Sequence, residues 1–164
     1  MSDQPLRVVI DTNTLLRGIL SEMSAAAKVR RAAEDRAIIP LLSKPVLDEY
    51  RAVLSRPHLL ERFPAITAEK IAFLIQRLLF IGEYVRMPTV RFQYRRDPLD
   101  AKFIELAIEL KATHIVNADK DLLSLPRGRG DAAKRFRSRL PGTEVLEAHD
   151  FLARHGLDET KGSF

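Results

Sequence analysis

The sequence predicts an α/β fold, a three-layer α/β/α sandwich with a central parallel sheet of four to five strands. Short apolar runs alternate with longer segments of helix formers along the chain, which is typical of a parallel sheet covered on both faces. The 164 residues are 46% hydrophobic and 30% charged, a composition that supports a packed core. We therefore expect one folded domain over residues 1–156, followed by a polar tail at 157–164.

The N-terminal part of the chain predicts a strand followed by two helices. Residues 7–10 are a mainly β-branched run that stops at Asp11, a residue type that favours turns and caps. Helix formers follow at 15–20 and 25–35, and Ser24 is placed to cap the second helix.

The middle of the chain predicts a second strand and two further helices. The apolar run 37–42 contains Pro40, which has no N–H to donate and therefore favours an edge or an early strand position. A proline in the first turn favours a helix at 44–54, and Thr67 is placed to cap another helix at 68–80.

The C-terminal half predicts the remaining strands and helices. Residues 83–87 and 114–116 are the third and fourth strands by their apolar character. Between them, Asp97 with a proline after it is the expected N-cap of a helix at 98–111. The last two elements are a weaker strand and a closing helix, at 144–146 and 149–155.

The composition excludes several classes of protein. Without cysteine, the chain has no disulfide scaffold, thiol catalysis or cysteine-based zinc site, and it suits a reducing cytoplasm. No apolar run approaches the ~20 residues of a membrane span, and no glycine-rich loop points to a nucleotide cofactor. The histidines lack metal-ligand spacing and are interpreted as surface or helix-end residues: His58, His114, His149 and His155. We expect a soluble, cytoplasmic protein without a membrane partner.

The charge balance favours a polyanionic partner. Lys and Arg number 27 against 22 Asp and Glu. The excess is concentrated in one segment, 127–139, which we call the basic segment. Its cationic residues are Arg127, Arg129, Lys134, Arg135, Arg137 and Arg139. Such a cluster attracts phosphates at short range, although a solvated loop and helix face is the alternative explanation.

Two helical acids are predicted at the margins of apolar helix faces. Helical geometry places Glu49 beside the apolar arc of helix 44–54 and turns Asp48 away from it. In helix 98–111, Asp100 falls at the core-facing margin, where an acid is costly unless a cation or donor meets it. The alternatives are a surface acid for Glu49 and a helix-capping carboxylate for Asp100.

These acids are expected at one edge of the sheet together with two others. Asp11 and Asp119 directly follow apolar strands, and ligands of open parallel sheets bind outside the carboxyl ends of the strands. Four converging carboxylates repel one another unless a divalent cation balances them, and oxygen-only ligands favour Mg²⁺ or Mn²⁺. Such sites serve phosphodiester chemistry. The alternative for Asp11, Asp119 and the nearby Asp121 is a turn or a helix cap.

Four segments, in this order, resemble the PIN-domain ribonucleases. They are Val9-Ile10-Asp11-Thr12-Asn13, Glu49-Tyr50, Asp97-Pro98-Leu99-Asp100 with Ala107 downstream, and Ile115-Val116-Asn117-Ala118-Asp119-Lys120-Asp121-Leu122-Leu123. The similarity is closest to VapC-type toxins of bacterial and archaeal toxin–antitoxin pairs and extends from Arg7 to Leu152. It implies an endoribonuclease that cleaves single-stranded RNA and depends on Mg²⁺ or Mn²⁺.

The resemblance also implies roles for individual residues. The acidic catalytic quartet corresponds to Asp11, Glu49, Asp100 and Asp119, with Asp11, Asp100 and Asp119 as the metal ligands. The supporting polar residues are Asn13, Asn117 and Asp121, and Asn117 stands where relatives usually carry Thr or Ser. Because an empty acidic pocket repels phosphate, we expect the basic segment to guide RNA towards it.

Other functions and partners remain open from the sequence. The serious alternative is a PIN-fold module that binds RNA or a partner protein without cutting. A haloacid-dehalogenase-like phosphatase is disfavoured, because Asn13 stands where that class needs a second aspartate. The resemblance implies a cognate antitoxin. An apolar surplus on helix 68–80 fits a homodimer or a partner groove, and full burial of the helix is the alternative: Ile71, Phe73, Leu74, Ile75, Leu78, Leu79 and Phe80.

Overall fold

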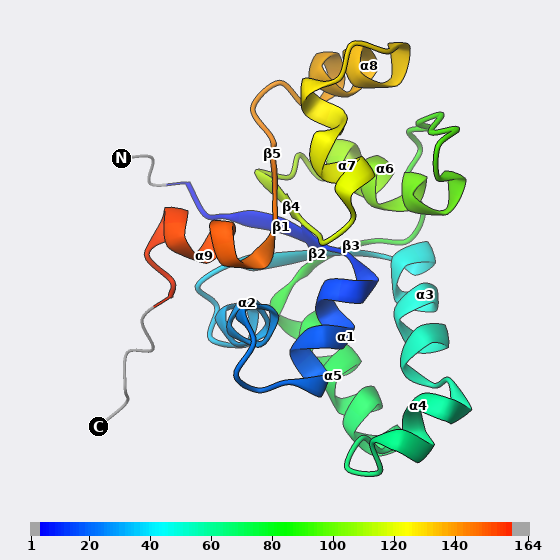
Figure 1. The fold of residues 1–164 in the computed structure, drawn as a ribbon, viewed down its shortest axis with the longest axis vertical. Coiled ribbons are helices and arrows are strands. Elements are labelled where there is room, and N and C mark those ends of the chain that lie inside the picture. Colours follow the sequence, from blue (N-terminus) through cyan, green and yellow to red (C-terminus); the bar gives the residue numbers. More distant parts are fainter. Residues whose placement is uncertain (1–3, 159–164) are drawn as a thin grey trace.

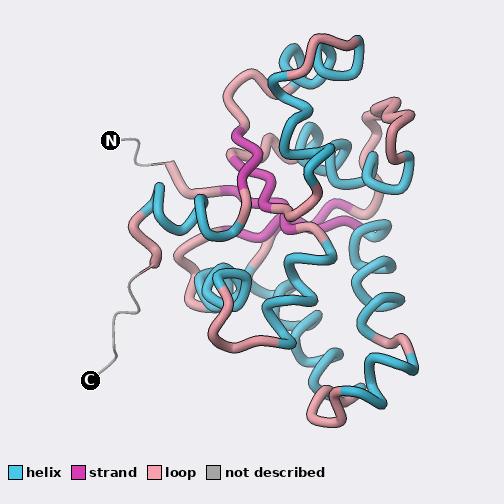
Figure 2. The backbone as a smooth tube through the Cα atoms, viewed as in Figure 1, coloured by secondary structure: helices cyan, strands magenta, loops and turns pink. Residues whose placement is uncertain are grey.

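The computed structural model describes residues 4–158 and shows a five-stranded parallel sheet (Figures 1 and 2). The strands are β1 (Arg7–Ile10), β2 (Ile39–Ser43), β3 (Glu83–Val85), β4 (His114–Val116) and β5 (Glu144–Leu146). Their order in the sheet is β3-β2-β1-β4-β5, and every neighbouring pair is parallel. The predicted fold class is therefore confirmed, with five strands.

Helices cover the sheet on both faces. They are α1 (Thr12–Leu20), α2 (Ala25–Glu34), α3 (Lys44–Leu54), α4 (Pro57–Arg62), α5 (Ala68–Ile81), α6 (Ala101–Glu109), α7 (Lys120–Ser124), α8 (Asp131–Arg139) and α9 (Ala148–His155). Figure 1 shows α1, α2 and α5 below the sheet and α6, α7 and α8 above it. Helix α5 packs on β2, and α6 packs on β1, β2 and β4. The result is the predicted three-layer sandwich.

Side-chain caps fix where the helices begin. The Ser24 side chain accepts a hydrogen bond from the N–H of Ala27 at 3.1 Å, and that of Thr67 accepts from Lys70 at 3.2 Å. Both caps were predicted from residue type and position. Each satisfies a backbone N–H that the helix itself leaves unpaired.

Three short helices escape the sequence prediction. They are α4, α7 and α8, of six, five and nine residues. At ~3.6 residues per turn these helices have at most two and a half turns, which carry too few apolar repeats for the periodicity to be visible. The predicted helix at 98–111 also differs, because a 3₁₀ turn η1 (Pro98–Asp100) precedes α6, and α6 ends at Glu109. The Asp97 side chain accepts from the N–H of Leu99 at 3.1 Å and so closes this tight turn.

Part of the apolar surplus on α5 faces solvent. Ile71, Leu74, Ile75 and Leu78 are buried against the core. By contrast, the side chains of Phe73 and Phe80 are 67% and 76% exposed, and Leu79 is partly exposed. Full burial of this helix is therefore wrong as an explanation of the surplus.

One histidine is placed differently from the expectation. His114 lies in β4 with only 5% of its surface exposed, so its interpretation as a surface or helix-end residue is wrong. A three-residue strand in the middle of a sheet buries whatever side chain it carries on its covered faces. The Nε2 atom of His114 lies 2.9 Å from Nε2 of His155, which is at the end of α9.

The hydrogen bonds around His114 assign its tautomer. The hydroxyl of Thr113 donates to the carbonyl of Arg7 at 3.0 Å and accepts from the Arg7 N–H at 2.9 Å. Nδ1 of His114 therefore donates to Thr113 Oγ1 at 2.8 Å, and its Nε2 accepts from His155. This arrangement requires a neutral His114.

Protonation of His114 should therefore destabilise the fold. Burial, and then the neighbouring His155, lower the pKa of His114 to about 4. Between the ordinary histidine pKa and this value, the unfolded chain binds a proton that the folded chain does not, so stability falls as the pH falls through this window. We expect the unfolding free energy of the wild type to lose about 1–2 kcal/mol more than that of His114→Phe between pH 7 and pH 4.5. Urea denaturation across that range measures the difference, and parallel curves for the two proteins would contradict it.

The ends of the chain complete the description. The predicted polar tail at 157–164 lies outside the described residues from position 159 onward. Leu157 still packs against the core, and Asp158 pairs with Lys28 at 2.9 Å. Within residues 4–158, no helix has the length and apolar character needed to cross a membrane.

Candidate active site

The candidate site lies where the sheet order changes direction. From β1 the chain moves outward to β2 and β3, and then returns across the sheet to β4 on the other side of β1. At such a switch point the loops after the two central strands part and leave a crevice. Asp11 follows β1 directly, and Asp119 follows β4 after Asn117 and Ala118.

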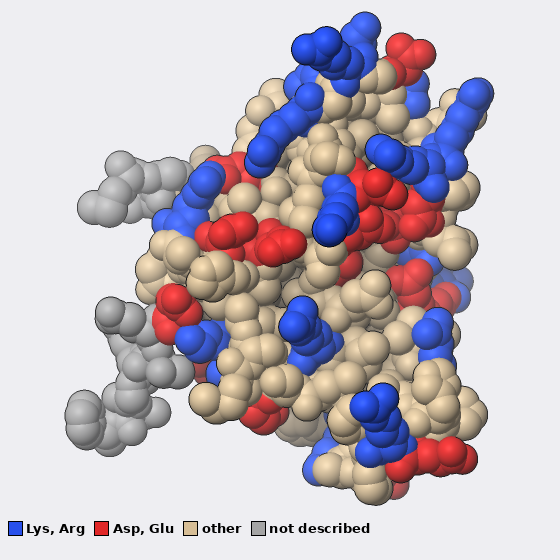
Figure 3. Space-filling view, viewed as in Figure 1, with Lys and Arg blue, Asp and Glu red and all other residues tan. Residues whose placement is uncertain are grey.

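Three carboxylates converge at this crevice. Asp97, Asp100 and Asp119 each offer an oxygen, and these oxygens all lie within 4.8 Å of one another. All three side chains are partly buried. Figure 3 shows acidic side chains gathered on this face of the molecule, bordered by Lys and Arg side chains towards α8. Two of these acids were predicted as metal ligands, whereas Asp97 was expected only as a helix cap.

Within this group, repulsion between the carboxylates shows in the pKa of Asp100. Burial, followed by the charges of Asp97 and Asp119, raises its pKa to about 7. It makes no capping hydrogen bond to α6, although it stands at the N-terminus of that helix. The capping explanation of Asp100 is therefore wrong. A carboxyl held this close to two others gains most from a cation that balances their charge.

Asp11 has a structural role at the same crevice. It caps α1, since its Oδ1 accepts from the N–H of Thr14 at 2.9 Å, and only 7% of its surface is exposed. Burial raises its pKa, and the charge of Asp119 adds to the increase. Its charge also acts on Asp100. Asp11 thus borders the group of three carboxylates without belonging to it.

Glu49 differs most from its predicted surroundings. Its Oε1 accepts a hydrogen bond from Nζ of Lys102 at 2.7 Å, and its other oxygen accepts from the hydroxyl of Thr12. The four acids were expected to converge without paired cations, and for Glu49 that expectation is wrong. The predicted half-burial of Glu49 is confirmed, with 22% of the side chain exposed. Asp48 points away, is 51% exposed and pairs with Lys44 at 2.6 Å.

The predicted supporting residues lie along the loop between β4 and α7 and beside it. Asn117 is fully buried, and its Oδ1 accepts from the N–H of Asp119 at 3.0 Å. Its Nδ2 atom has no hydrogen-bond partner among the described residues. Asp119 in turn caps α7 by accepting from the N–H of Asp121 at 2.8 Å. The Asp121 carboxylate pairs with Arg96 at 3.2 Å, and Asn13 is exposed in the first turn of α1.

Two residues of this site were missed by the sequence analysis. Asp97 was interpreted only as a cap, yet only its Oδ1 accepts the capping hydrogen bond from the N–H of Leu99, and its other oxygen remains available. The three-residue spacing of Asp97 and Asp100 could have revealed its role, because one 3₁₀ turn brings both side chains to the same face of the turn. Lys102 gave no comparable signal, because its partner Glu49 is distant in sequence.

The residues present fit a hard divalent cation. The donors are carboxylate oxygens, which Mg²⁺ and Mn²⁺ prefer over softer ligands. The raised pKa of Asp100 shows that the group lacks a compensating positive charge of its own. Lys102 is committed to Glu49 rather than to the three aspartates.

The basic segment contains tethered side chains and side chains that have no partner in the part of the chain that the structure describes. Arg135 donates to the carbonyl of Gln93 at 3.0 Å. Arg137 donates to the carbonyls of Pro126 and Gly128, at 2.9 and 2.7 Å. The segment forms η2 (Leu125–Arg127) and α8, and its remaining cations are exposed: Arg127, Arg129, Lys134 and Arg139. Two of its arginines therefore hold the local backbone together.

Comparison with known proteins agrees with this geometry. The PIN domain family matches residues 7–121, which contain β1 to β4 and every acid of the site. Neither curated proteins nor solved structures give a match. The match covers well over half of the chain, so the chain belongs to the PIN domain family, whose members are generally metal-dependent nucleases.

Proposed function

We propose that this protein is a Mg²⁺- or Mn²⁺-dependent endoribonuclease that cleaves single-stranded RNA. One observation carries the proposal: three carboxylates with oxygens within 4.8 Å of one another lie at the switch point of a PIN-domain sheet. Structural ion-pair networks do not explain these three acids, because no cation of the described residues is paired with Asp97, Asp100 or Asp119.

The proposed roles follow from where each side chain lies. Asp97, Asp100 and Asp119 would hold the cation, with Asp11 adding negative charge from the buried side. When bound, the divalent ion supplies an activated water and stabilises the charge that develops on the phosphodiester. Asn117 positions the Asp119 backbone through its Oδ1. Lys102 and the hydroxyl of Thr12 hold the Glu49 carboxylate in place between α1 and α6.

RNA is proposed as the substrate because of the charge around the site. The exposed cations of the basic segment lie on the same side of the sheet as α7, which Asp119 caps. Positive surface beside an acidic centre draws a polyanion towards it. The resemblance to VapC-type toxins adds the further proposal that the protein is the toxin of a toxin–antitoxin pair. Its exposed α5 face, with Phe73 and Phe80, is offered to an antitoxin or a second copy.

A cleavage assay tests the proposal directly. With a saturating concentration of Mn²⁺ or Mg²⁺, labelled single-stranded RNA should be cut, and EDTA should stop the reaction. Double-stranded RNA and single-stranded DNA serve as comparison substrates. If the wild type binds Mn²⁺ yet cuts none of these, the binding module without cleavage becomes the better proposal.

A growth assay tests the toxin role separately. Induced wild-type protein should arrest growth of a bacterial host, and Asp100→Asn should not. Co-purification with the product of a neighbouring small open reading frame would support a cognate antitoxin. Cleavage in vitro without growth arrest would reject the toxin role and leave the nuclease.

A further inference from the structure

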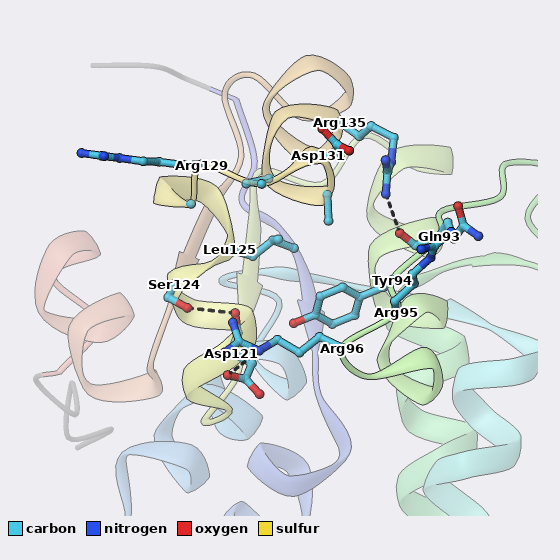
Figure 4. A pocket seen from close by; sticks show the side chains of 14 residues that line it. Gln93, Tyr94, Arg95, Arg96, Asp121, Ser124, Leu125, Arg129, Asp131 and Arg135 are labelled. Carbon is cyan, nitrogen blue, oxygen red and sulfur yellow. Dashed lines mark hydrogen bonds and ion pairs between the residues drawn. The ribbon is translucent and has the colours of Figure 1, made fainter.

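A cavity opens beside the acidic centre, between residues 93–96 and the helices α7 and α8 (Figure 4). Its volume is about 430 Å³, which is sufficient for one nucleotide and within the range of ligand sites. The cavity adjoins the candidate active site through two chain neighbours. Arg96 directly precedes Asp97, and Asp121 lies two residues after Asp119.

The rim of the cavity is positively charged. Four arginines line it, against two aspartates: Arg95, Arg96, Arg129 and Arg135, with Asp121 and Asp131. Arg96 is paired with Asp121, and Arg135 is tethered to the carbonyl of Gln93. Arg95 and Arg129 have no hydrogen bond or ion pair among the residues that the structure describes. These two guanidinium groups are free to bind an anion, and arginine is well suited to phosphate.

A buried hydroxyl without a partner lies inside the cavity wall. Tyr94 is only 4% exposed, and its hydroxyl has no hydrogen-bond partner in the described part of the chain. Figure 4 shows the ring projecting into the cavity, with its hydroxyl towards Leu125 and Asp121. A buried hydroxyl without a partner destabilises the free protein, so this one gains a hydrogen bond when a ligand enters.

Apolar groups complete the wall around Tyr94. Leu125 and Ala133 are buried and line the same cavity. An aromatic ring, a leucine and an alanine form a surface on which a planar base can lie. The ion pair between Arg96 and Asp121 is largely exposed, 67% and 45%. Such a pair opens easily, because exposed ion pairs contribute little to stability.

We propose that this cavity binds one nucleotide of the single-stranded RNA, next to the phosphodiester that is cleaved. Arg95 and Arg129 lie on opposite sides of the cavity, and in the free protein the Arg129 side chain points away from it (Figure 4), so each binds one of the two phosphates that flank this nucleotide. The base lies against Leu125 and Ala133, and the Tyr94 hydroxyl donates a hydrogen bond to it. A phosphate that draws Arg96 away from Asp121 opens the access to this hydroxyl. The identity of the ligand as RNA rests on the proposed function, whereas the binding site rests on the cavity and its residues.

RNA binding without metal tests the site apart from catalysis. The probe is a fluorescein-labelled ten-nucleotide single-stranded RNA, and fluorescence anisotropy is measured in EDTA at 0.15 M salt. The double variant Arg95→Ala/Arg129→Ala should raise the Kd about tenfold or more, because two charge-assisted contacts are lost. Neither side chain has a hydrogen bond or ion pair within residues 4–158, so the melting temperature of the double variant should match that of the wild type.

The matched control removes equal charge elsewhere. Arg51→Ala/Arg56→Ala lies on α3 and just before α4, at the opposite end of the molecule from α8 (Figure 1). It should change the Kd by no more than about twofold, since only long-range attraction is lost. Equal weakening by both double variants would overturn the proposal and leave diffuse charge attraction.

Tyr94→Phe tests the base contact without a change of charge. With homopolymeric ten-nucleotide RNAs, the variant should lose about threefold or more in affinity for the best-bound base and little for the others. If Tyr94→Phe binds the same bases in the same order and with the same affinities as the wild type, the proposed role of Tyr94 is rejected. Wild-type cleavage in Mn²⁺ is scored separately. If the wild type cleaves RNA but the two double variants bind it equally well, the nucleotide site is rejected and the nuclease proposal stands. If only Arg95→Ala/Arg129→Ala weakens binding and the wild type does not cleave, the nuclease proposal is rejected and the nucleotide site stands.

Discussion

Asp100→Asn should lower the rate of metal-dependent RNA cleavage by about 1,000-fold or more. A divalent ion at such a site contributes several kcal/mol to transition-state stabilisation, and each ~1.4 kcal/mol is a factor of ten in rate. The amide removes one of three charged ligands whose oxygens lie within 4.8 Å of one another. Mn²⁺ titration by calorimetry should show a matching loss of affinity.

The same substitution should leave the metal-free fold as stable as before, or more stable. Burial and two neighbouring carboxylates raise the pKa of Asp100 to about 7, so at and above neutral pH its charge is held at a cost. A neutral amide removes that cost, and Asp100 gives no capping hydrogen bond to α6 that could be lost. In EDTA, the melting temperature should stay level or rise.

Asp48→Asn is the matched control. Asp48 is an exposed aspartate on α3 that pairs with Lys44 and lies outside the acidic group. Its variant should cleave within about twofold of the wild type, as expected for a surface substitution. Full activity of Asp100→Asn, with the wild-type affinity for Mn²⁺, would contradict the proposed role of the acidic group.

Gly82→Ala should strongly destabilise the fold. Gly82 joins α5 to β3, and a Cβ atom there would lie 2.4 Å from the carbonyl oxygen of Pro40 and 2.8 Å from that of Leu78. Both neighbours are backbone, so neither can move aside without displacing β2 or the end of α5. We expect a loss of about 3 kcal/mol or more in the free energy of unfolding, at the upper end for an overpacked core.

Gly142→Ala provides the comparison for this prediction. A Cβ at Gly142 meets nothing within 4 Å, so the same chemical change should stay within about 1 kcal/mol of the wild type. Urea denaturation measures both variants under the same conditions. Equal stability of the two variants would contradict the prediction, because it would mean that the backbone after α5 can move away from Pro40 without loss of stability.

The sheet was predictable because its central strands are short, mainly apolar runs that end at polar residues. Residues 7–10 and 114–116 are short apolar runs followed by polar residues, and both become central strands with the expected bounds. The candidate site followed from the same reasoning, since parallel strands end at one edge. Asp100 and Asp119 were therefore expected together, and their oxygens do converge.

The remaining features depend on contacts between segments far apart in the chain. The pairing of Glu49 with Lys102 joins α3 to α6 across 53 positions, and no local pattern encodes it. His114 is buried because β5 and α9 cover its strand, which its own three-residue run does not reveal. The position of α8 depends on the buried Phe136 and on arginines that donate to backbone carbonyls. A single buried aromatic residue within a charged segment does not predict this packing.

Asp11 and Asp119 each border the crevice and also cap an α-helix. These two roles affect how a protein of this fold can lose catalytic activity during evolution. Asp11 receives the N–H of Thr14, and Asp119 receives that of Asp121. Asparagine caps a helix as well as aspartate does, and a change of one nucleotide in the codon converts aspartate to asparagine. Replacement of either acid by asparagine would therefore remove a charge from the crevice and leave the architecture intact. An ancestral enzyme can pass in one step to a binding protein of the same shape, whereas alanine at these positions would disturb the helices as well.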